Sequence, residues 1–124
     1  MKLILFVLNN AEKTLDVLSA WKEAGVTGAT VLFSTGMGRI HLTDALRDDL
    51  PLIPSLSDFY IHDKDLSRTI FSVLDDDSLV EKVTQATARV VGSLDLPGNG
   101  ILIILPVESV HGLIRYPSQT SAAE

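Results

Sequence analysis

The stretch from Gly25 to Arg39, GVTGATVLFSTGMGR, contains the transitions that decide the fold. Gly25 follows an amphipathic segment and is typical of the residue just beyond a helix, where the backbone turns left-handed. Thr27 to Thr35 is rich in β-branched and apolar residues, which predicts a strand. Gly36 and Gly38 break this pattern, so we expect the strand to end there and a loop to begin.

The segment before this stretch predicts a strand followed by a helix. Lys2 to Leu8 is a continuous run of Leu, Ile, Phe and Val, which is typical of a central strand covered on both faces. Asn9 or Asn10 offers a side-chain oxygen as the N-cap of the helix. Apolar residues then recur every three or four positions and predict one buried helix face, formed by Ala11, Leu15, Leu18, Trp21 and Ala24.

The second half of the chain repeats the pattern of strand, helix, glycine and strand. Arg68 to Leu74 predicts a third strand, and Ile101 to Val107 a fourth that is apolar on both faces. We interpret the acidic run Asp75-Asp76-Asp77 as the start of a helix rather than a metal site, because the helix dipole favours negative charge there. Val110 to Arg115 predicts a short edge element. The helix ends at Gly92, and its predicted buried face consists of Leu79, Val80, Val83, Ala86, Val90 and Val91.

Two β-α-β units joined by the long segment 39–67 predict an α+β fold of the ferredoxin-like βαββαβ type. We expect one domain over residues 1–115, with an antiparallel sheet and both helices on one of its faces, and a flexible tail over residues 116–124. Because the strands are apolar on both sides, the other face of the sheet needs cover. A homotrimer in which the sheets line a central cavity is one common solution and the one we expect, although a dimer would also cover this face.

The composition narrows the class of protein. The chain has 124 residues, of which 46% are hydrophobic, and its 16 acidic and 10 basic residues give a net charge of −6. Without a basic cluster, binding to nucleic acid is not expected. The absence of cysteine excludes disulfides, thiolate metal sites and a cysteine nucleophile. The apolar run at the start is too short to span a membrane, so we expect a cytoplasmic protein without membrane insertion.

The stretch GVTGATVLFSTGMGR resembles the second strand of the nitrogen-regulatory PII family, which shows G-I-x-G-x-T-V followed by G-x-G-R at the same spacing. Gly98-Asn99-Gly100 matches the position of a glycine-rich turn before the last strand of that family. The resemblance implies a trimer that binds an adenine nucleotide in the clefts between subunits. It also implies that segment 39–67 corresponds to the family's T-loop, which changes conformation with the ligand and contacts a protein partner, such as a transporter or an enzyme.

The resemblance also assigns the residues of the nucleotide site. Ile101 stands where the family has a lysine, and the terminal region keeps only Arg115, which favours a ligand with fewer charges than ATP. The adenine nucleotides considered are ATP, ADP, AMP and a cyclic nucleotide; bicarbonate or no nucleotide at all are the alternatives, and no cofactor is obligatory. By resemblance, the phosphates lie beside the backbone of Gly36, Met37 and Gly38 and the guanidinium of Arg39, the base lies near Thr30, and the turn Gly98, Asn99, Gly100 approaches from the other side.

Two alternatives belong to other classes of protein. A metal-binding trimer like the CutA proteins would use His41, His62 or His111, but no two of these histidines have the spacing of three or four residues that is typical of ligands on one helix. A small enzyme would use Glu108 and His111 for acid–base chemistry. The spacing of the histidines gives no reason to expect a metal site. No catalytic motif surrounds any serine, so we do not expect an enzyme. The apolar stretch 50–54 either docks a partner or covers the domain's own core.

Overall fold

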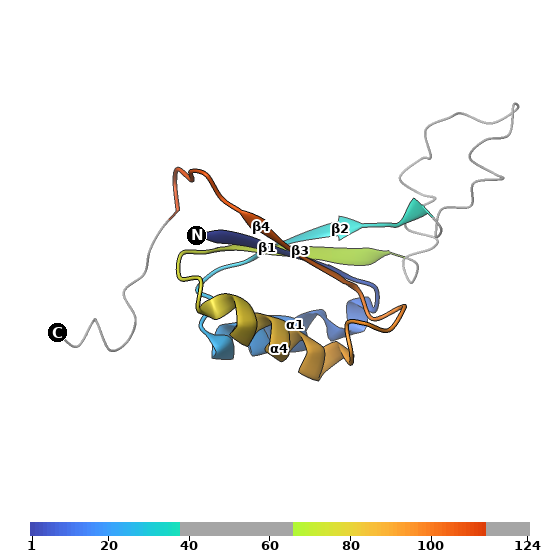
Figure 1. The fold of residues 1–124 in the computed structure, drawn as a ribbon. Coiled ribbons are helices and arrows are strands. Elements are labelled where there is room, and N and C mark those ends of the chain that lie inside the picture. Colours follow the sequence, from blue (N-terminus) through green and yellow to red (C-terminus); the bar gives the residue numbers. More distant parts are fainter. Residues whose placement is uncertain (38–65, 114–124) are drawn as a thin grey trace, which may run out of the picture.

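The computed structural model describes residues 1–37 and 66–113. The sheet has the strand order β2-β3-β1-β4, with antiparallel neighbours, and both helices cover one of its faces (Figure 1). This α+β architecture confirms the predicted class and is compatible with a ferredoxin-like sandwich. The elements are β1 (Lys2–Leu8), a short 3-10 helix (Ala11–Lys13), α1 (Thr14–Ala24), β2 (Thr30–Ser34), β3 (Ser67–Leu74), α4 (Leu79–Val91) and β4 (Ile101–Pro106).

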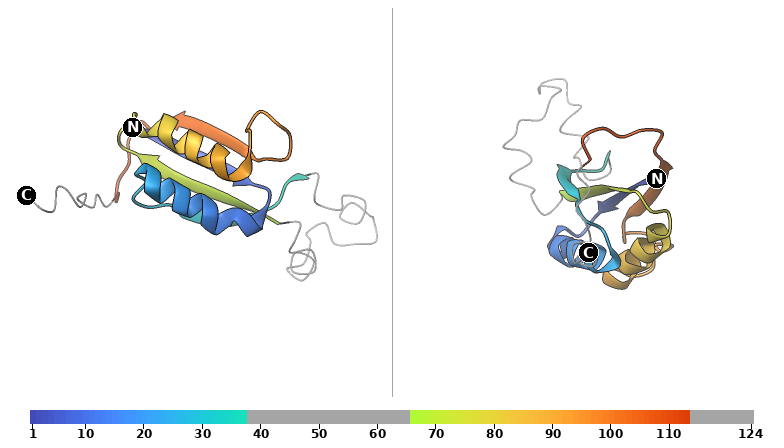
Figure 2. Two further views of the ribbon diagram at one scale, coloured as in Figure 1. Left: turned by 90° about the horizontal axis from the view of Figure 1, so that it is seen from below. Right: turned by 90° about the vertical axis from the view of Figure 1, so that its left-hand side faces the viewer.

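The central position of β1 explains its uninterrupted apolar sequence. It pairs with β3 on one side and β4 on the other, so that Leu5 lies opposite both Phe71 and Ile103. Its alternate residues Ile4, Phe6 and Leu8 are buried, and they form the core with residues of both helices. The two helices lie side by side beneath the sheet (Figure 2).

The helical region formed by the 3-10 helix and α1 begins and ends where the sequence predicts, and the predicted residues Leu18, Trp21 and Ala24 do face the core. The side chain of Asn10 accepts a hydrogen bond from the Glu12 N–H at 3.1 Å, and Gly25 has a φ of +117° just beyond the helix. The prediction for Leu15 is wrong, because its side chain is 76% exposed and Val17 is buried instead. The first turn is a 3-10 turn, which advances about 120° per residue instead of about 100°, so the register of an ideal α-helix does not hold there.

The two helices are joined in the core by a buried hydrogen bond. Trp21 Nε1 donates to Thr87 Oγ1 at 2.8 Å, and the same hydroxyl donates to the carbonyl of Val83 at 2.7 Å. Thr87 is fully buried, although the apolar pattern of α4 did not include it. A buried indole N–H without a partner is costly, so this threonine is what allows a tryptophan to fill the space between the helices.

The prediction of an edge element after β4 is wrong over the part of it that the structure describes. Residues 107–113 contain no strand, and Gly112 has a φ of +87°, which interrupts an extended backbone. The Val107 N–H still donates to the Met1 carbonyl at 3.2 Å, beyond the end of the ladder. The tail 116–124 and nearly all of segment 39–67, including the apolar stretch 50–54, lie outside the described residues.

Replacing Thr87 with valine tests the contact between the helices. Thr87→Val keeps the shape of the side chain but leaves the indole N–H of Trp21 buried without an acceptor. We expect the free energy of unfolding to fall by about 1–3 kcal/mol in chemical denaturation followed by circular dichroism. The control is Thr84→Val, since the Thr84 hydroxyl only donates to Val80 O in its own helix, at 2.7 Å. An equal loss in both variants would show that the contact with Trp21 adds nothing.

Candidate functional site

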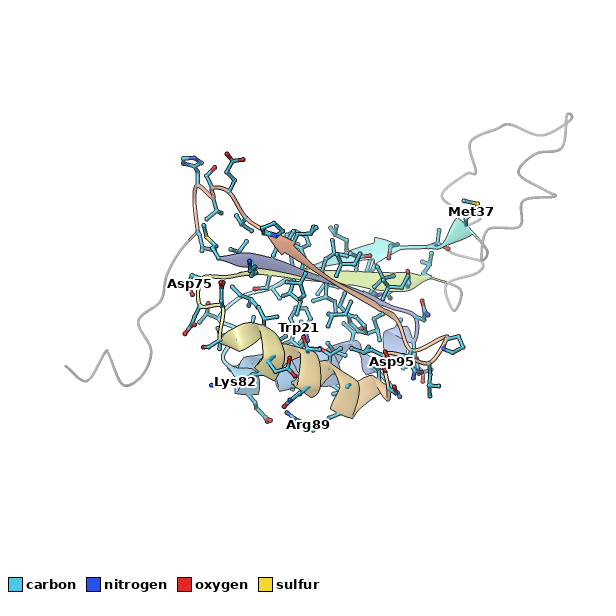
Figure 3. The ribbon with its side chains drawn as sticks, in the orientation of Figure 1. Trp21, Met37, Asp75, Lys82, Arg89 and Asp95 are labelled. Carbon is cyan, nitrogen blue, oxygen red and sulfur yellow. The ribbon has the colours of Figure 1, made fainter. Side chains whose placement is uncertain are left out.

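One end of the sheet, here called the loop end, gathers the segments that the sequence connects with ligand binding. Strand β2 ends there at Ser34, opposite Ser67 at the start of β3. Val7, near the end of β1, lies opposite Ile101, the first residue of β4. Met37 after β2 and Asp95 in the segment before β4 are therefore found toward the same end of the molecule (Figure 3). The paired directions of the strands, not sequence proximity, bring these segments to one end.

The predicted site residues on β2 occupy both ends of that strand. Gly36 and Met37 follow Ser34 at the loop end, and Met37 is 75% exposed. Thr30 is exposed but is the first residue of β2. At about 3.3 Å per residue it lies roughly 20 Å along the chain from Gly36. Gly38 and Arg39 lie outside the described residues.

The turn Gly98-Asn99-Gly100 is fixed by hydrogen bonds to the rest of the domain. The side-chain amide of Asn99 donates to the carbonyl of Ser93 at 2.7 Å, and that of Asn9 donates to the carbonyl of Gly98 at 3.2 Å. The amide of Asn99 is thus engaged in holding the turn against the end of α4. The turn is preorganised, and any contact of Asn99 with a ligand would compete with this bond.

Gly100 has a packing role that is separate from any ligand. Its φ is +111°, and a Cβ atom at this position would lie 2.6 Å from the Phe6 ring and 2.7 Å from the Val7 carbonyl oxygen. Since both neighbours belong to the central strand, neither can move away without disturbing the sheet. At Gly98 the φ is +89°, but nothing lies within 4 Å of the Cβ position. Glycine at position 100 is therefore explained by the fold itself.

The two parts of the predicted site lie on opposite edges of the sheet. Gly36 and Met37 follow the edge strand β2, whereas Gly98 to Gly100 precede the other edge strand, β4. Strands β3 and β1 lie between them, which at about 4.8 Å per strand corresponds to roughly 14 Å. A single chain therefore does not enclose a small ligand between these two parts.

Sequence reasoning missed a pair of side chains at the loop end. Arg68 lies opposite Phe33 in the pairing of β2 and β3, and its guanidinium carbon is 4.2 Å from the centroid of the Phe33 ring. This is a cation–π contact, yet Phe33 remains 77% exposed. The sequence could have indicated this contact, because antiparallel pairing of the second and third predicted strands brings the end of the second strand, with Phe33, beside the start of the third, with Arg68.

The face of the sheet away from the helices, here called the open face, is largely apolar. Residues that alternate with the buried core residues form it, and four of its aliphatic side chains are 39–60% exposed: Leu32, Ile101, Ile103 and Leu105. The strand register places the following residues on it: Leu3, Leu5, Val7, Leu32, Phe71, Val73, Ile101, Ile103 and Leu105. Near the loop end it also carries a hydroxyl cluster, in which Ser34 Oγ lies 2.7 Å from Ser67 Oγ and accepts from Thr69 Oγ1 at 2.9 Å.

The acidic run Asp75-Asp76-Asp77 lies at the opposite end of the sheet and helps to form the start of α4. The carboxylate of Asp76 accepts a hydrogen bond from the Ser78 N–H at 2.9 Å, and this bond lowers the pKa of Asp76. Asp77 bonds the Met1 ammonium at 2.9 Å, and this contact lowers the pKa of Asp77. No group of three metal-ligating side chains occurs in the described part of the chain. Asp76 therefore bonds the residue before α4, in agreement with the predicted place of this run at the start of a helix, whereas Asp77 bonds the ammonium of Met1.

The structure describes only some of the residues considered for a metal site or for acid–base chemistry. His41 and His62 lie outside the described ranges. Glu108 and His111 are both exposed and follow the end of β4, away from the loop end.

Compared with models of known protein families and with curated proteins, the sequence matches none. Within residues 1–37 and 66–113, no helix has the length and apolar character needed to cross a membrane.

Alanine at positions 98 and 100 separates backbone strain from close packing. Both glycines have a positive φ, but only at Gly100 does the added Cβ meet other atoms. We expect Gly98→Ala to lower the free energy of unfolding by about 1–2 kcal/mol, and Gly100→Ala to lower it clearly further. Thermal and urea unfolding measure the difference. Equal losses would mean that the approach of Phe6 to Gly100 is not a constraint.

Proposed function

We propose that this chain is the subunit of a PII-like signalling protein, a homotrimer that binds a small effector, an adenine nucleotide, in the clefts between its subunits. The observation that carries the proposal is the position of the two glycine segments. Gly36 and the turn Gly98 to Gly100 lie at the same end of the sheet but on opposite edges. In a closed ring of copies, the β2 edge of one subunit approaches the β4 edge of the next, so each cleft receives both segments.

The open face supports the assembly. The open face carries apolar side chains on all four strands, and those on the edge strands β2 and β4, Leu32, Ile101, Ile103 and Leu105, are 39–60% exposed, which is unfavourable in water. Burial stabilises by about 25 cal/mol for each Å² of apolar surface, so association of these faces is the simplest way to remove the surface from solvent. The hydroxyl cluster of Ser34, Ser67 and Thr69 would mark the polar end of such an interface.

The chemistry of the cleft suits an anion of modest charge. Glycine lets the backbone approach a phosphate closely and direct N–H groups at it, and Arg39 would add a forked cation. The turn ends at Ile101, an aliphatic residue that is 60% exposed, so this side of the cleft supplies no charge. We therefore expect AMP or a cyclic nucleotide to be favoured over ATP.

Signalling would occur by a shift of population. A ligand beside Gly36 to Arg39 touches the start of segment 39–67, so it favours those conformations of the segment that contact the ligand. The segment would then present or withhold a surface for a protein partner, a transporter or an enzyme. Such a change requires only that the ligand bind one conformation more tightly than another.

Calorimetric titration tests the nucleotide part of the proposal. We expect saturable binding of AMP or a cyclic nucleotide, with ATP weaker, and a loss of affinity of about tenfold or more in Arg39→Ala. Lys82→Ala is the control, because Lys82 is an exposed cation on helix α4. If no adenine nucleotide gives heat with a protein shown to be trimeric, the nucleotide proposal fails.

A charge on the open face tests the assembly. Ile103 lies in the middle of β4 and is 39% exposed, so Ile103→Glu would leave the fold intact but place a carboxylate in the interface. We expect a trimer for the parent protein and a monomer for the variant in light scattering coupled to size exclusion. Leu15→Glu, at a helix position that is 76% exposed, should remain trimeric. A variant Ile103→Glu with the parent mass would show that the open face is not the interface.

A further inference from the structure

We infer that Phe33 and Arg68 form the platform on which the effector's adenine base stacks and near which its phosphate binds, an inference that rests on the proposed function. The pair lies on neighbouring strands at the loop end. Phe33 lies within the stretch GVTGATVLFSTGMGR and Arg68 lies outside it, and neither was a predicted site residue. The pair would supply an aromatic surface and a cation on the β2 side of the cleft.

The exposure of Phe33 is the first observation. Its side chain is 77% exposed although its neighbour two residues earlier, Val31, packs against the core. The Arg68 guanidinium covers one face of the ring at 4.2 Å. An exposure of 77% leaves the opposite face accessible to a planar group. Aromatic side chains that bind bases in this way accept any base, because every base has a π-face.

The charge of Arg68 is the second observation. Among residues 1–37 and 66–113 the one salt bridge joins the Met1 ammonium to Asp77, so no carboxylate there neutralises Arg68. Its Nη1 donates to the carbonyl of Ser67 at 3.2 Å, and the guanidinium has further N–H donors. Within the described ranges, the partners of this partly buried cation are an aromatic ring and one carbonyl, an arrangement that is suited to receive an anion.

The position of the pair is the third observation. Phe33 precedes Gly36 by three residues on an edge strand, which is roughly 10 Å at about 3.3 Å per residue. A base stacked about 3.5 Å above the free ring face would lie about 8 Å from the guanidinium, which covers the other face at 4.2 Å. A 5′-phosphate can pass the edge of the ring over that distance. A nucleoside monophosphate fits this arrangement, whereas a long polyphosphate chain would extend beyond it.

These observations favour a nucleotide over another copy of the chain as the occupant. A neighbouring apolar surface would use the ring of Phe33 but would bury the charge of Arg68 without a partner, which is costly. A nucleotide provides a planar group for the ring and an anion for the guanidinium. The same pair would therefore compensate for the aliphatic residue at Ile101 in the proposed cleft.

Titration with AMP and with adenosine separates the two contacts. In calorimetry, Phe33→Leu should weaken both ligands about fivefold or more, because the stacking surface is lost for each. Arg68→Gln should weaken AMP about tenfold or more but leave adenosine within about twofold, because only AMP carries a phosphate. Matched controls are Leu15→Ala, which is an exposed apolar position on α1, and Arg89→Gln, which is an exposed cation on α4. Neither control should change either affinity.

The possible outcomes separate this inference from the proposed function. If the parent protein binds AMP and both variants bind it equally well, the platform is wrong and the proposed function stands. If the parent protein binds no adenine ligand, the proposed nucleotide function and the platform both fail. If Phe33→Leu changes the mass of the assembly in light scattering while affinity per subunit is retained, Phe33 belongs to the interface between copies and the inference is overturned.

Discussion

The structure depends on the position of β1, which is hydrogen-bonded on both sides and apolar on both faces. Its buried residues Ile4, Phe6 and Leu8 hold the helices, and its other residues form the middle of the open face. Because Phe6 and Val7 approach the start of β4 closely, the chain must enter that strand through a glycine, Gly100. One strand thus constrains the core, the surface that needs cover and one border of the candidate site.

The sequence was a sufficient guide to architecture, because its signals are local. Asn10 and Gly25 mark the ends of the first helical region through backbone geometry that few other residues satisfy. The failures concern properties that a neighbouring element decides. Leu15 has the spacing of a core residue but lies on the solvent side of α1, and Thr87 is polar but buried because Trp21 on the other helix needs an acceptor. No single-segment periodicity contains that information.

In the candidate site, too, the sequence shows the local features but not the properties that neighbouring elements decide. The glycine segments could be found in the sequence, but their arrangement on opposite edges follows only from the strand order. The turn at Gly98 to Gly100 also has a structural explanation, since Asn99 and Asn9 hold it and Phe6 requires its last glycine. Glycines in that turn are therefore weaker indicators of a ligand than the contact of Arg68 with an exposed aromatic ring, which the core does not require.

The position of Trp21 has a consequence for experiments in solution. It is the one tryptophan of the chain, it is 1% exposed, and its N–H is hydrogen-bonded between the helices. Its fluorescence should be blue-shifted and should report loss of the helical layer directly. The indole lies beneath the sheet, so it does not touch the loop end (Figure 3). A change in its emission on adding an effector would therefore mean that binding at the edge of the sheet alters the packing between the helices.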